Sequence, residues 1–163
     1  MKLLRALRFD DSDTRVYERA AEDGEWAVPG GFEFAGDTAE TLAGKRRQAF
    51  ANGFLGLAGF GRATFVAVAT ADDAVRRRLV EALAGHFVDR YGAPDRAAAR
   101  PVAEQEIDFA AELAADYEPG TTLTVVRELG ADGVHESFRR VAAAEPGAVQ
   151  SLWTMFDEDG KFR

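Results

Sequence analysis

The stretch from Ala63 to Tyr91 reads ATFVAVATADDAVRRRLVEALAGHFVDRY. Its first part, Ala63–Ala69, is almost continuously apolar, which predicts a central strand that is covered on both faces or nearly so. Thr70 and Asp73 then form a helix-capping signature. Beyond them, apolar residues recur at every fourth position, namely Val75, Leu79, Leu83, Phe87 and Tyr91. This spacing predicts an amphipathic helix, so a buried strand followed by a helix defines the centre of the fold.

Short strand-like runs precede this centre. Leu3–Phe9 has a mixed period-two pattern that predicts an opening strand. Arg15–Arg19 and Glu25–Val28 lie on either side of a polar stretch, and we expect them to form a hairpin. After a break at Pro29–Gly31, we expect Phe32–Phe34 to continue as a further edge strand.

A first helix is predicted between these strands and the central one. Asp37, with Glu40 three residues later, resembles a helix N-cap with its reciprocal partner. The helix should therefore run from Thr38 to about Asn52. The glycines within Gly53–Gly61 are poor helix formers, so they should end it in a tight apolar connection.

A third helix should begin at Pro101, because proline is favoured in a first helical turn and harmful in a helix interior. Its apolar face would consist of Phe109, Leu113 and Tyr117. The dipeptide Pro119-Gly120 should end it.

Two strand-like runs follow the third helix. Thr121–Leu129 and Val134–Val141 flank a glycine-containing turn and predict a hairpin. For residues 142–163 we expect a C-terminal hairpin or extension. The order of elements predicts one globular domain, residues 1–163, of the α+β class, with a mainly antiparallel sheet and about three helices packed on one face.

Composition narrows the class of protein. The chain has 163 residues, no cysteine and a formal net charge of −8 at pH 7, which argues against binding to nucleic acid or to anionic membranes. Arg5 and Arg8 interrupt the apolar residues at the N-terminus, unlike in a signal peptide. No apolar run approaches the roughly 18 residues of a membrane helix. We therefore expect a cytoplasmic protein.

No motif in the sequence assigns a chemistry. Gly53, Gly56, Gly59 and Gly61 precede a strand, whereas phosphate-binding glycine loops follow a strand and open a helix. With two histidines and no cysteine, we expect no metal site and no cofactor. No set of nucleophile, base and orienting residue is recognisable, which favours a protein without catalytic activity.

Large aromatic residues beside glycines form the first candidate site. Trp26, Phe32 and Phe34 flank the break at Pro29–Gly31. Phe54 and Phe60 lie within the glycine-rich connection. Aromatic rings on flexible backbone suit a pocket rim or a partner-binding surface, and equally a turn that closes the core.

A pocket between the sheet and the helices is the second hypothesis. There, His135, Glu33 and Arg139 would supply the acid, base and anion contacts of an enzyme or small-ligand-binding protein. Lys45, the first residue of a basic triplet, is a further candidate, although three adjacent helical residues spread over about 200° and cannot all face one anion. A structural homo-oligomer, which needs only self-contacts, is the third hypothesis.

Four segments of the sequence carry a resemblance to known proteins. They are Leu3–Asp10, Glu25–Phe34 (EWAVPGGFEF), Gly44–Phe50 (GKRRQAF) and Gly53–Gly56 (GFLG). Together they resemble a family of short bacterial proteins known only as a domain of unknown function, over most of the chain up to about Val141. The resemblance brings no catalytic or binding residues, but it implies help in the assembly of another enzyme. We therefore expect a non-catalytic accessory or binding protein, a homodimer, that contacts a protein partner through its aromatic surface.

Overall fold

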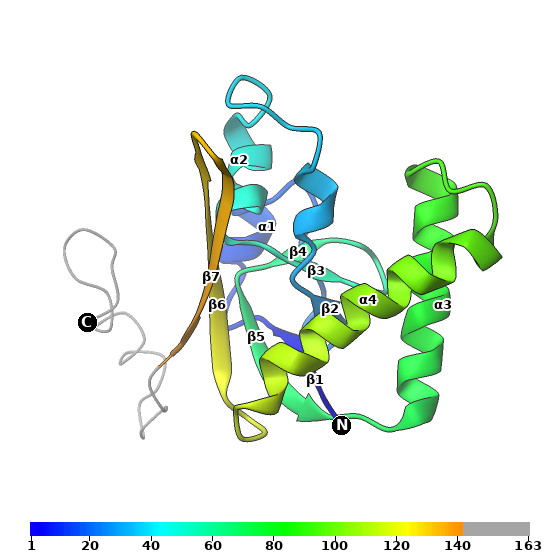
Figure 1. Cartoon of the computed structure of the whole chain (residues 1–163). Coiled ribbons are helices and arrows are strands. Elements are labelled where there is room, and N and C mark those ends of the chain that lie inside the picture. Colours follow the sequence, from blue (N-terminus) through cyan, green and yellow to red (C-terminus); the bar gives the residue numbers. More distant parts are fainter. Residues whose placement is uncertain (142–163) are drawn as a thin grey trace.

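The computed structural model describes residues 1–141 and contains a seven-stranded antiparallel sheet with the order β4-β3-β2-β1-β5-β6-β7 (Figure 1). The strands are β1 (Lys2–Leu7), β2 (Trp26–Val28), β3 (Phe54–Gly56), β4 (Arg62–Ala63), β5 (Phe65–Thr70), β6 (Thr122–Gly130) and β7 (Gly133–Arg140). The helices are α1 (Ser12–Val16), the short 3-10 helix η1 (Gly31–Phe34), α2 (Gly44–Asn52), α3 (Asp73–Arg90) and α4 (Arg96–Ala115). The predicted α+β class is confirmed. The hairpin or extension expected for residues 142–163 lies outside the described residues.

The sheet curls because one continuous segment, residues 62–70, forms both the edge strand β4 and the central strand β5. Only Thr64 separates β4 from β5. β4 pairs with β3, its neighbour at the edge of the sheet. β5 instead pairs with β1 along its whole length, from Leu7↔Phe65 to Lys2↔Thr70. An isolated parallel bridge between Ala20 and Arg62 ties the chain after α1 to the same segment. The prediction that Ala63–Ala69 is a central strand is therefore confirmed for β5, which lies between β1 and β6.

The main core lies between the sheet and the two helices α3 and α4, which pack against each other. Figure 1 shows α4 crossing the sheet with α3 beside it, and α4 contacts β1 and β2. The buried face of α4 is formed by Ala99, Ala103, Ile107, Ala110 and Ala114. These mostly small side chains let the helix approach the sheet closely. On α3, Leu79, Leu83 and Phe87 are buried, as the four-residue spacing predicts.

The start of the first helix was predicted wrongly. α2 begins at Gly44 and not at Thr38. Asp37 does not cap a helix, because its carboxylate accepts hydrogen bonds from Thr41 and Arg46 instead. Gly44 has a φ of 59°, in the left-handed region, and this backbone turn separates the helix from the preceding residues.

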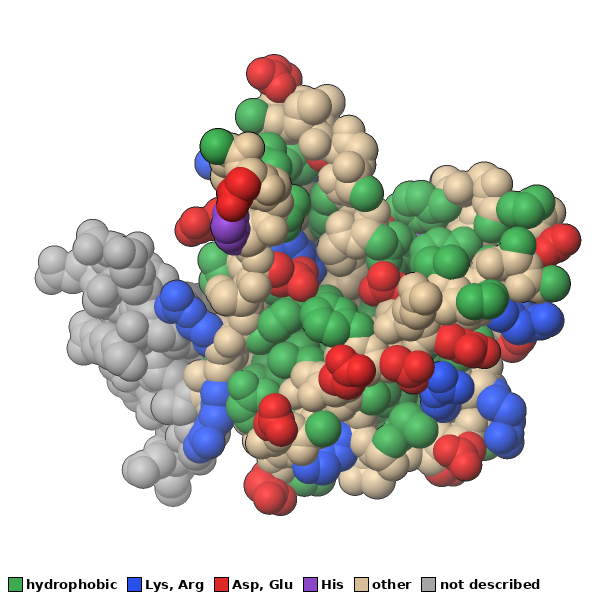
Figure 2. All heavy atoms as spheres, viewed as in Figure 1, with side chains coloured by type: hydrophobic (Ala, Val, Ile, Leu, Met, Phe, Trp, Pro, Cys, Tyr) green, Lys and Arg blue, Asp and Glu red, His purple; other side chains and the backbone are tan. Residues whose placement is uncertain are grey.

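The start of α4 was also predicted wrongly. Asp95 accepts a hydrogen bond from the Ala98 amide and caps a helix that begins at Arg96, so Pro101 lies inside it. The predicted apolar face is only partly correct: Leu113 and Tyr117 are half-buried against the core, but Phe109 is 40% exposed and contacts Phe138 edge-on. Figure 2 shows apolar side chains gathered between β7 and α4. The α3 cap is Asp72, whose carboxylate accepts from the Val75 amide.

Three shorter segments differ from their predicted structure. The chain that includes Arg15–Arg19 forms the end of α1 and a loop rather than a strand. Tyr17 from this loop is buried, and its hydroxyl contacts Thr64 at 2.8 Å. Phe32–Phe34 lies in η1 rather than in a strand, and the connection Gly53–Gly61 contains the short strand β3. The hairpin predicted from Thr121–Leu129 and Val134–Val141 is confirmed as β6 and β7, paired from Leu123↔Arg140 to Gly130↔Gly133.

Candidate functional site

Helix η1 positions the central residue of the site, Glu33. The chain leaves β2 and turns at Gly30, which has a φ of 73°. A Cβ atom at this position would lie 2.5 Å from the Leu55 Cβ, so only glycine fits the turn. η1 then carries Glu33 toward α3. Phe32 packs edge-on against Phe87 of α3 and against Tyr91, the residue that follows α3. In Figure 1, η1 faces the C-terminal end of α3.

Glu33 accepts hydrogen bonds from three side chains, one from β4 and two from the C-terminal end of α3. The Arg62 guanidinium lies 2.5 Å from Oε1, the His86 Nε2 atom lies 3.4 Å from Oε2, and the Tyr91 hydroxyl donates to Oε2. Burial raises the pKa of Glu33, but the charge of Arg62 and these hydrogen bonds outweigh it, so the pKa lies below its ordinary value. Burial and the Glu33 carboxylate raise the pKa of Tyr91, which keeps its hydroxyl protonated as a donor.

Arg62 fixes the base of the site. Its guanidinium also donates to the carbonyl oxygens of Gly53 and Gly30, both at 3.1 Å. It lies 4.7 Å from the centre of the Phe34 ring, and its side chain is 7% exposed. Burial lowers the pKa of Arg62 to about 10, which leaves it cationic at neutral pH. An arginine with these partners is held in one position.

Phe60 has a strained backbone and forms one wall of the site. Its φ is 56°, and it is the non-glycine residue with positive φ within residues 1–141. Its ring stacks on the His86 imidazole with a centroid distance of 3.8 Å and an angle of 2° between planes. A bulky side chain in the left-handed region costs free energy and concentrates at functional sites. The strain at Phe60 therefore marks this wall as a candidate functional position.

Two adjoining hollows form a cleft around these residues. The smaller has a volume of about 200 Å³ and the larger about 590 Å³. Both are lined by Glu18, Arg19, Glu33 and Phe60. The smaller is also lined by Lys45, Arg46, Arg62 and Phe34, and the larger by His86, Arg90 and Tyr91. We call this cleft, with both hollows, the Glu33 cleft.

The Glu33 cleft is rich in cations that have no carboxylate partner. Five of its lining residues are lysine or arginine, against two glutamates. Arg62 pairs with Glu33, and Arg46 pairs with Asp37. Within residues 1–141, no carboxylate lies within salt-bridge distance of the other three cations, which are Arg19, Lys45 and Arg90. These three side chains are exposed and can contact an anion in the cleft.

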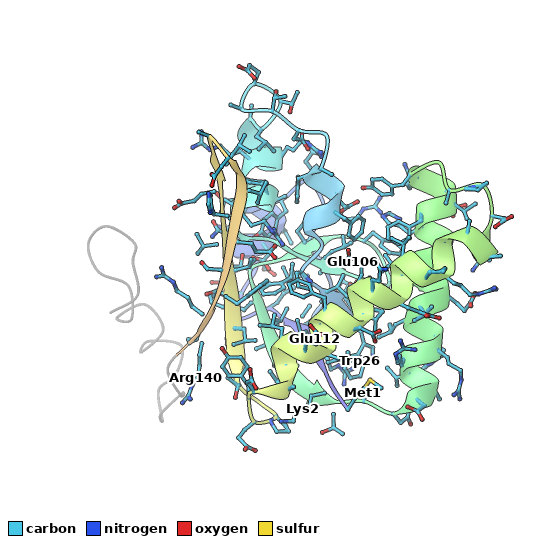
Figure 3. All side chains as sticks on the ribbon, in the orientation of Figure 1. Met1, Lys2, Trp26, Glu106, Glu112 and Arg140 are labelled. Carbon is cyan, nitrogen blue, oxygen red and sulfur yellow. The ribbon has the colours of Figure 1, made fainter. Side chains whose placement is uncertain are left out.

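The predicted aromatic residues lie at several different places. Phe60 lines the Glu33 cleft. Phe32 does not line it but packs edge-on against Tyr91, which does. Phe34 and Phe54 are buried, at 5% and 0% exposure, so neither can form an exposed binding surface. Trp26, labelled in Figure 3, lies on β2 opposite Arg5 of β1, whose guanidinium lies over its ring, and it does not line the Glu33 cleft.

The predicted group of His135, Glu33 and Arg139 does not form. His135 lies on β7 and contacts Asp132 at 2.7 Å near the hairpin turn. Arg139 is an exposed residue of the same strand. Glu33 instead contacts His86 and its other partners on the α3 side of η1. The reason is the alternation of side chains along β7: Glu136 and Phe138 face inward, toward Arg127 and Phe54, so His135 and Arg139 lie on the opposite face of the strand. Lys45, by contrast, lines the cleft as a candidate binding residue.

The cleft residues that sequence reasoning missed include Arg19, Arg62, His86, Arg90 and Tyr91. Tyr91 continues the apolar stripe of α3 and was interpreted as core. A usable signal was Arg62, a charged residue at the start of an otherwise apolar run. His86 and Arg90 offered another, because they are four residues apart and therefore share one helix face. Within residues 1–141, no group of histidine and acidic side chains is placed to hold a metal ion.

Fold and cleft together define a small α+β protein with a cationic, aromatic-walled cleft between η1 and α3. The chain belongs to a family of unknown function, DUF6505, whose model matches residues 1–154. This confirms the resemblance seen in the sequence and extends it beyond Val141. Neither a curated protein nor a solved structure matches the chain significantly. Among the helices of residues 1–141, none is long and apolar enough to cross a membrane.

Proposed function

We propose that the protein binds a small organic anion in the Glu33 cleft. The observation that carries this proposal is the presence of three exposed cations without carboxylate partners, Arg19, Lys45 and Arg90, around one hollow surface. Other cations within residues 1–141 also lack a carboxylate partner, so what distinguishes these three is that they converge on one cleft. Cations that converge on a cleft raise the local concentration of anionic ligands. The volume of the larger hollow, about 590 Å³, is that of a small-molecule site.

Binding is favoured over catalysis by the state of Glu33. A general base needs a pKa near the working pH and a free lone pair. The pKa of Glu33 is lowered, and its oxygens already accept from Arg62, His86 and Tyr91. The carboxylate therefore serves to hold three donors in place. This supports the expectation of a protein without catalytic activity.

A dye-binding experiment tests this proposal. Anilinonaphthalene sulfonate is an aromatic organic anion whose fluorescence rises on binding. The double variant Arg19→Glu/Arg90→Glu should weaken saturable binding of the dye about tenfold or more, because two contacts to the anion become repulsive. Both side chains are exposed, so the fold should persist, and circular dichroism checks this.

A matched control separates the cleft from the overall charge. The double variant Arg77→Glu/Arg78→Glu makes the same change in net charge at exposed positions of α3 that do not line the cleft. It should bind the dye like the natural chain. Equal loss of binding in both double variants, or no saturable binding by the natural chain, would contradict the proposal.

A second candidate function, self-association or contact with a protein partner, is supported by β7. Within residues 1–141 this strand pairs only with β6, and Val134 at its start is 51% exposed. Edge strands with free backbone groups pair readily with a second chain. The homodimer, the accessory role and the cytoplasmic location remain predictions of this candidate.

Light scattering tests the dimer. The natural chain should show the mass of two chains, and Val134→Lys should shift it toward one, because an edge lysine opposes strand pairing. A single-chain mass for the natural protein over all concentrations would contradict self-association through β7.

A further inference from the structure

We infer that the ligand of the Glu33 cleft is a phosphate monoester of a planar heteroaromatic group, the chemistry of a mononucleotide. The phosphate would occupy the smaller hollow and the ring the larger one. This inference rests on the proposed function and specifies its ligand. Three features of the cleft carry it: the number of cations at one end, the start of α2, and the aromatic rings at the other end.

The smaller hollow suits a phosphate better than a carboxylate. Arg19, Lys45 and Arg46 line a volume of about 200 Å³, with Arg62 at its base. A carboxylate is satisfied by one guanidinium, whereas a phosphate dianion offers three strongly accepting oxygens and binds several cations. Arg62 and Arg46 are engaged by Glu33 and Asp37, so Arg19 and Lys45 are the cations available to the ligand.

Helix α2 adds a second source of positive potential at the same hollow. The helix has nine residues and begins at Gly44 without a side-chain cap. Lys45 and Arg46 of its first turn and Ala49 of its second line the hollow, so the N-terminal half of α2 forms part of its wall. The N-terminus of a helix carries a partial positive charge and favours phosphate groups.

The larger hollow suits a planar ring. Its walls include Phe60, His86 and Tyr91, which form a continuous aromatic group: Phe60 stacks on His86, and His86 meets Tyr91 at 5.4 Å. Aromatic walls of this kind bind bases by stacking on their faces or edges. The Glu18 carboxylate supplies an acceptor for the amino or ring N–H groups of a heteroaromatic ligand.

One ligand can occupy both hollows because they share a boundary. Arg19, Glu33 and Phe60 line both of them. A molecule with its phosphate beside Lys45 would therefore pass over Phe60 to reach the ring site. Two separate ligands would not need this common wall.

Isothermal titration calorimetry on the full chain tests the inference with three probes: inorganic phosphate, adenosine and adenosine monophosphate. The monophosphate should bind about tenfold or more tightly than either of the other two, because it gains both sets of contacts at once. Adenosine monophosphate that binds no more tightly than inorganic phosphate would overturn the ring part of the inference.

Two single variants separate the two ends of the ligand. Lys45→Glu should weaken phosphate and adenosine monophosphate about tenfold and leave adenosine unchanged. Phe60→Gly should weaken adenosine and its monophosphate and leave inorganic phosphate unchanged. Glycine accepts the positive φ at position 60, so this variant keeps the backbone while it removes the ring. Arg77→Glu, outside the cleft, is the control for both. Variants that weaken all three probes equally would overturn the two-ended assignment.

The failure of this inference is distinguishable from the failure of the proposed function. If neither phosphate nor adenosine monophosphate binds while the sulfonate dye still binds in an Arg19- and Arg90-dependent way, the phosphate inference is overturned and the anion-binding function stands. If the dye also fails to bind, both are overturned.

Discussion

Arg127 joins three separate parts of the chain through one buried side chain. Its guanidinium donates to the carbonyl oxygens of Phe50 and Gly53 at 2.9 and 3.0 Å, and also to that of Pro29. It pairs with Glu136 at 2.6 Å. We expect Arg127→Met to lower the free energy of unfolding by about 3 kcal/mol or more, because it leaves these carbonyls and a carboxylate without their donor.

Urea denaturation measures this change. Arg139→Met on β7 is the matched control, since Arg139 is exposed and should change stability by less than about 0.5 kcal/mol. Similar stability losses in the two variants would show that the Arg127 contacts contribute little.

Glu33 should make the fold sensitive to acid. Its pKa is lowered in the folded state, so the stability it contributes is present above the ordinary value of 4.5 and is lost as the pH falls below it. Glu33→Gln should therefore melt at a lower temperature than the natural chain at pH 7. The difference between the two should shrink as the pH drops below about 4.5.

Glu106 on α4, labelled in Figure 3, provides a comparison of opposite sign. Burial, with a smaller effect of Glu136, raises the pKa of Glu106, so its ionised form destabilises the fold at neutral pH. Glu106→Gln should raise the melting temperature at pH 7, with no gain well below pH 4.5. Melting temperatures of both variants between pH 3 and pH 7 check the two directions of pKa shift. A variant whose melting temperature differed from that of the natural chain by the same amount at every pH would contradict the shift assigned to its residue.

Single residues of the site were predictable only where the chain was locally unusual. Glu33 and Phe60 drew attention because each lies beside glycines, and glycine permits the turns that present them. His86 was interpreted as an ordinary residue near a helix end. What gives it a role is contact with Phe60 and Glu33, which lie 26 and 53 residues away along the chain. Sequence spacing carries no information about such contacts.

At the scale of elements, α4 contains a proline where helices rarely tolerate one. Pro101 is the sixth residue of a helix that begins at Arg96, so it cannot donate to the Ala97 carbonyl. We expect Pro101→Ala to raise the free energy of unfolding by about 1–3 kcal/mol, because alanine restores this hydrogen bond and is a strong helix former.

Pro94 provides the control for this prediction. It lies in the connection between α3 and α4, where proline interrupts no helical hydrogen bond. There proline affects stability only by restricting the conformations of the unfolded chain. Pro94→Ala should therefore be neutral or lose up to about 1 kcal/mol. Chemical denaturation of both variants decides the question, and equal effects would show that α4 already accommodates Pro101 without a lost bond.

The elements that were predicted correctly are those with a strong periodic pattern. α3 shows the four-residue spacing over its whole length, and β6 and β7 carry strand-forming residues around a clear turn. The start of α4 was missed because Asp95 is a local cap that competes with the proline signal at Pro101. η1 was missed because Phe32 and Phe34 have the spacing of a strand, while the turn at Gly30 determines their conformation.

At the scale of the whole molecule, the curl of the sheet was beyond reach of the sequence. Nothing in the apolar run after Gly61 indicates that its first residues pair with β3 while the rest pair with β1. This curl brings Arg62 of β4 beside Glu33 of η1 and places Arg19 and Phe60 on the same cleft. The site therefore depends on the tertiary fold of the sheet, which strand patterns alone do not specify.

Gly61 is the position at which this dependence can be tested. A Cβ atom there would lie 2.5 Å from both the carbonyl carbon and the oxygen of Ala20, where the chain after α1 meets β4. Gly61→Ala should force these two segments apart and lower the free energy of unfolding by about 1–3 kcal/mol. It should also weaken dye binding, because Arg19 and Phe60 flank the displaced backbone. Gly59→Ala is the control, since no atom lies within 4 Å of its added methyl group. If Gly61→Ala lost stability but kept the natural affinity for the dye, the cleft would not depend on the closure of the sheet, and its residues would have to be positioned by η1 and α3 alone.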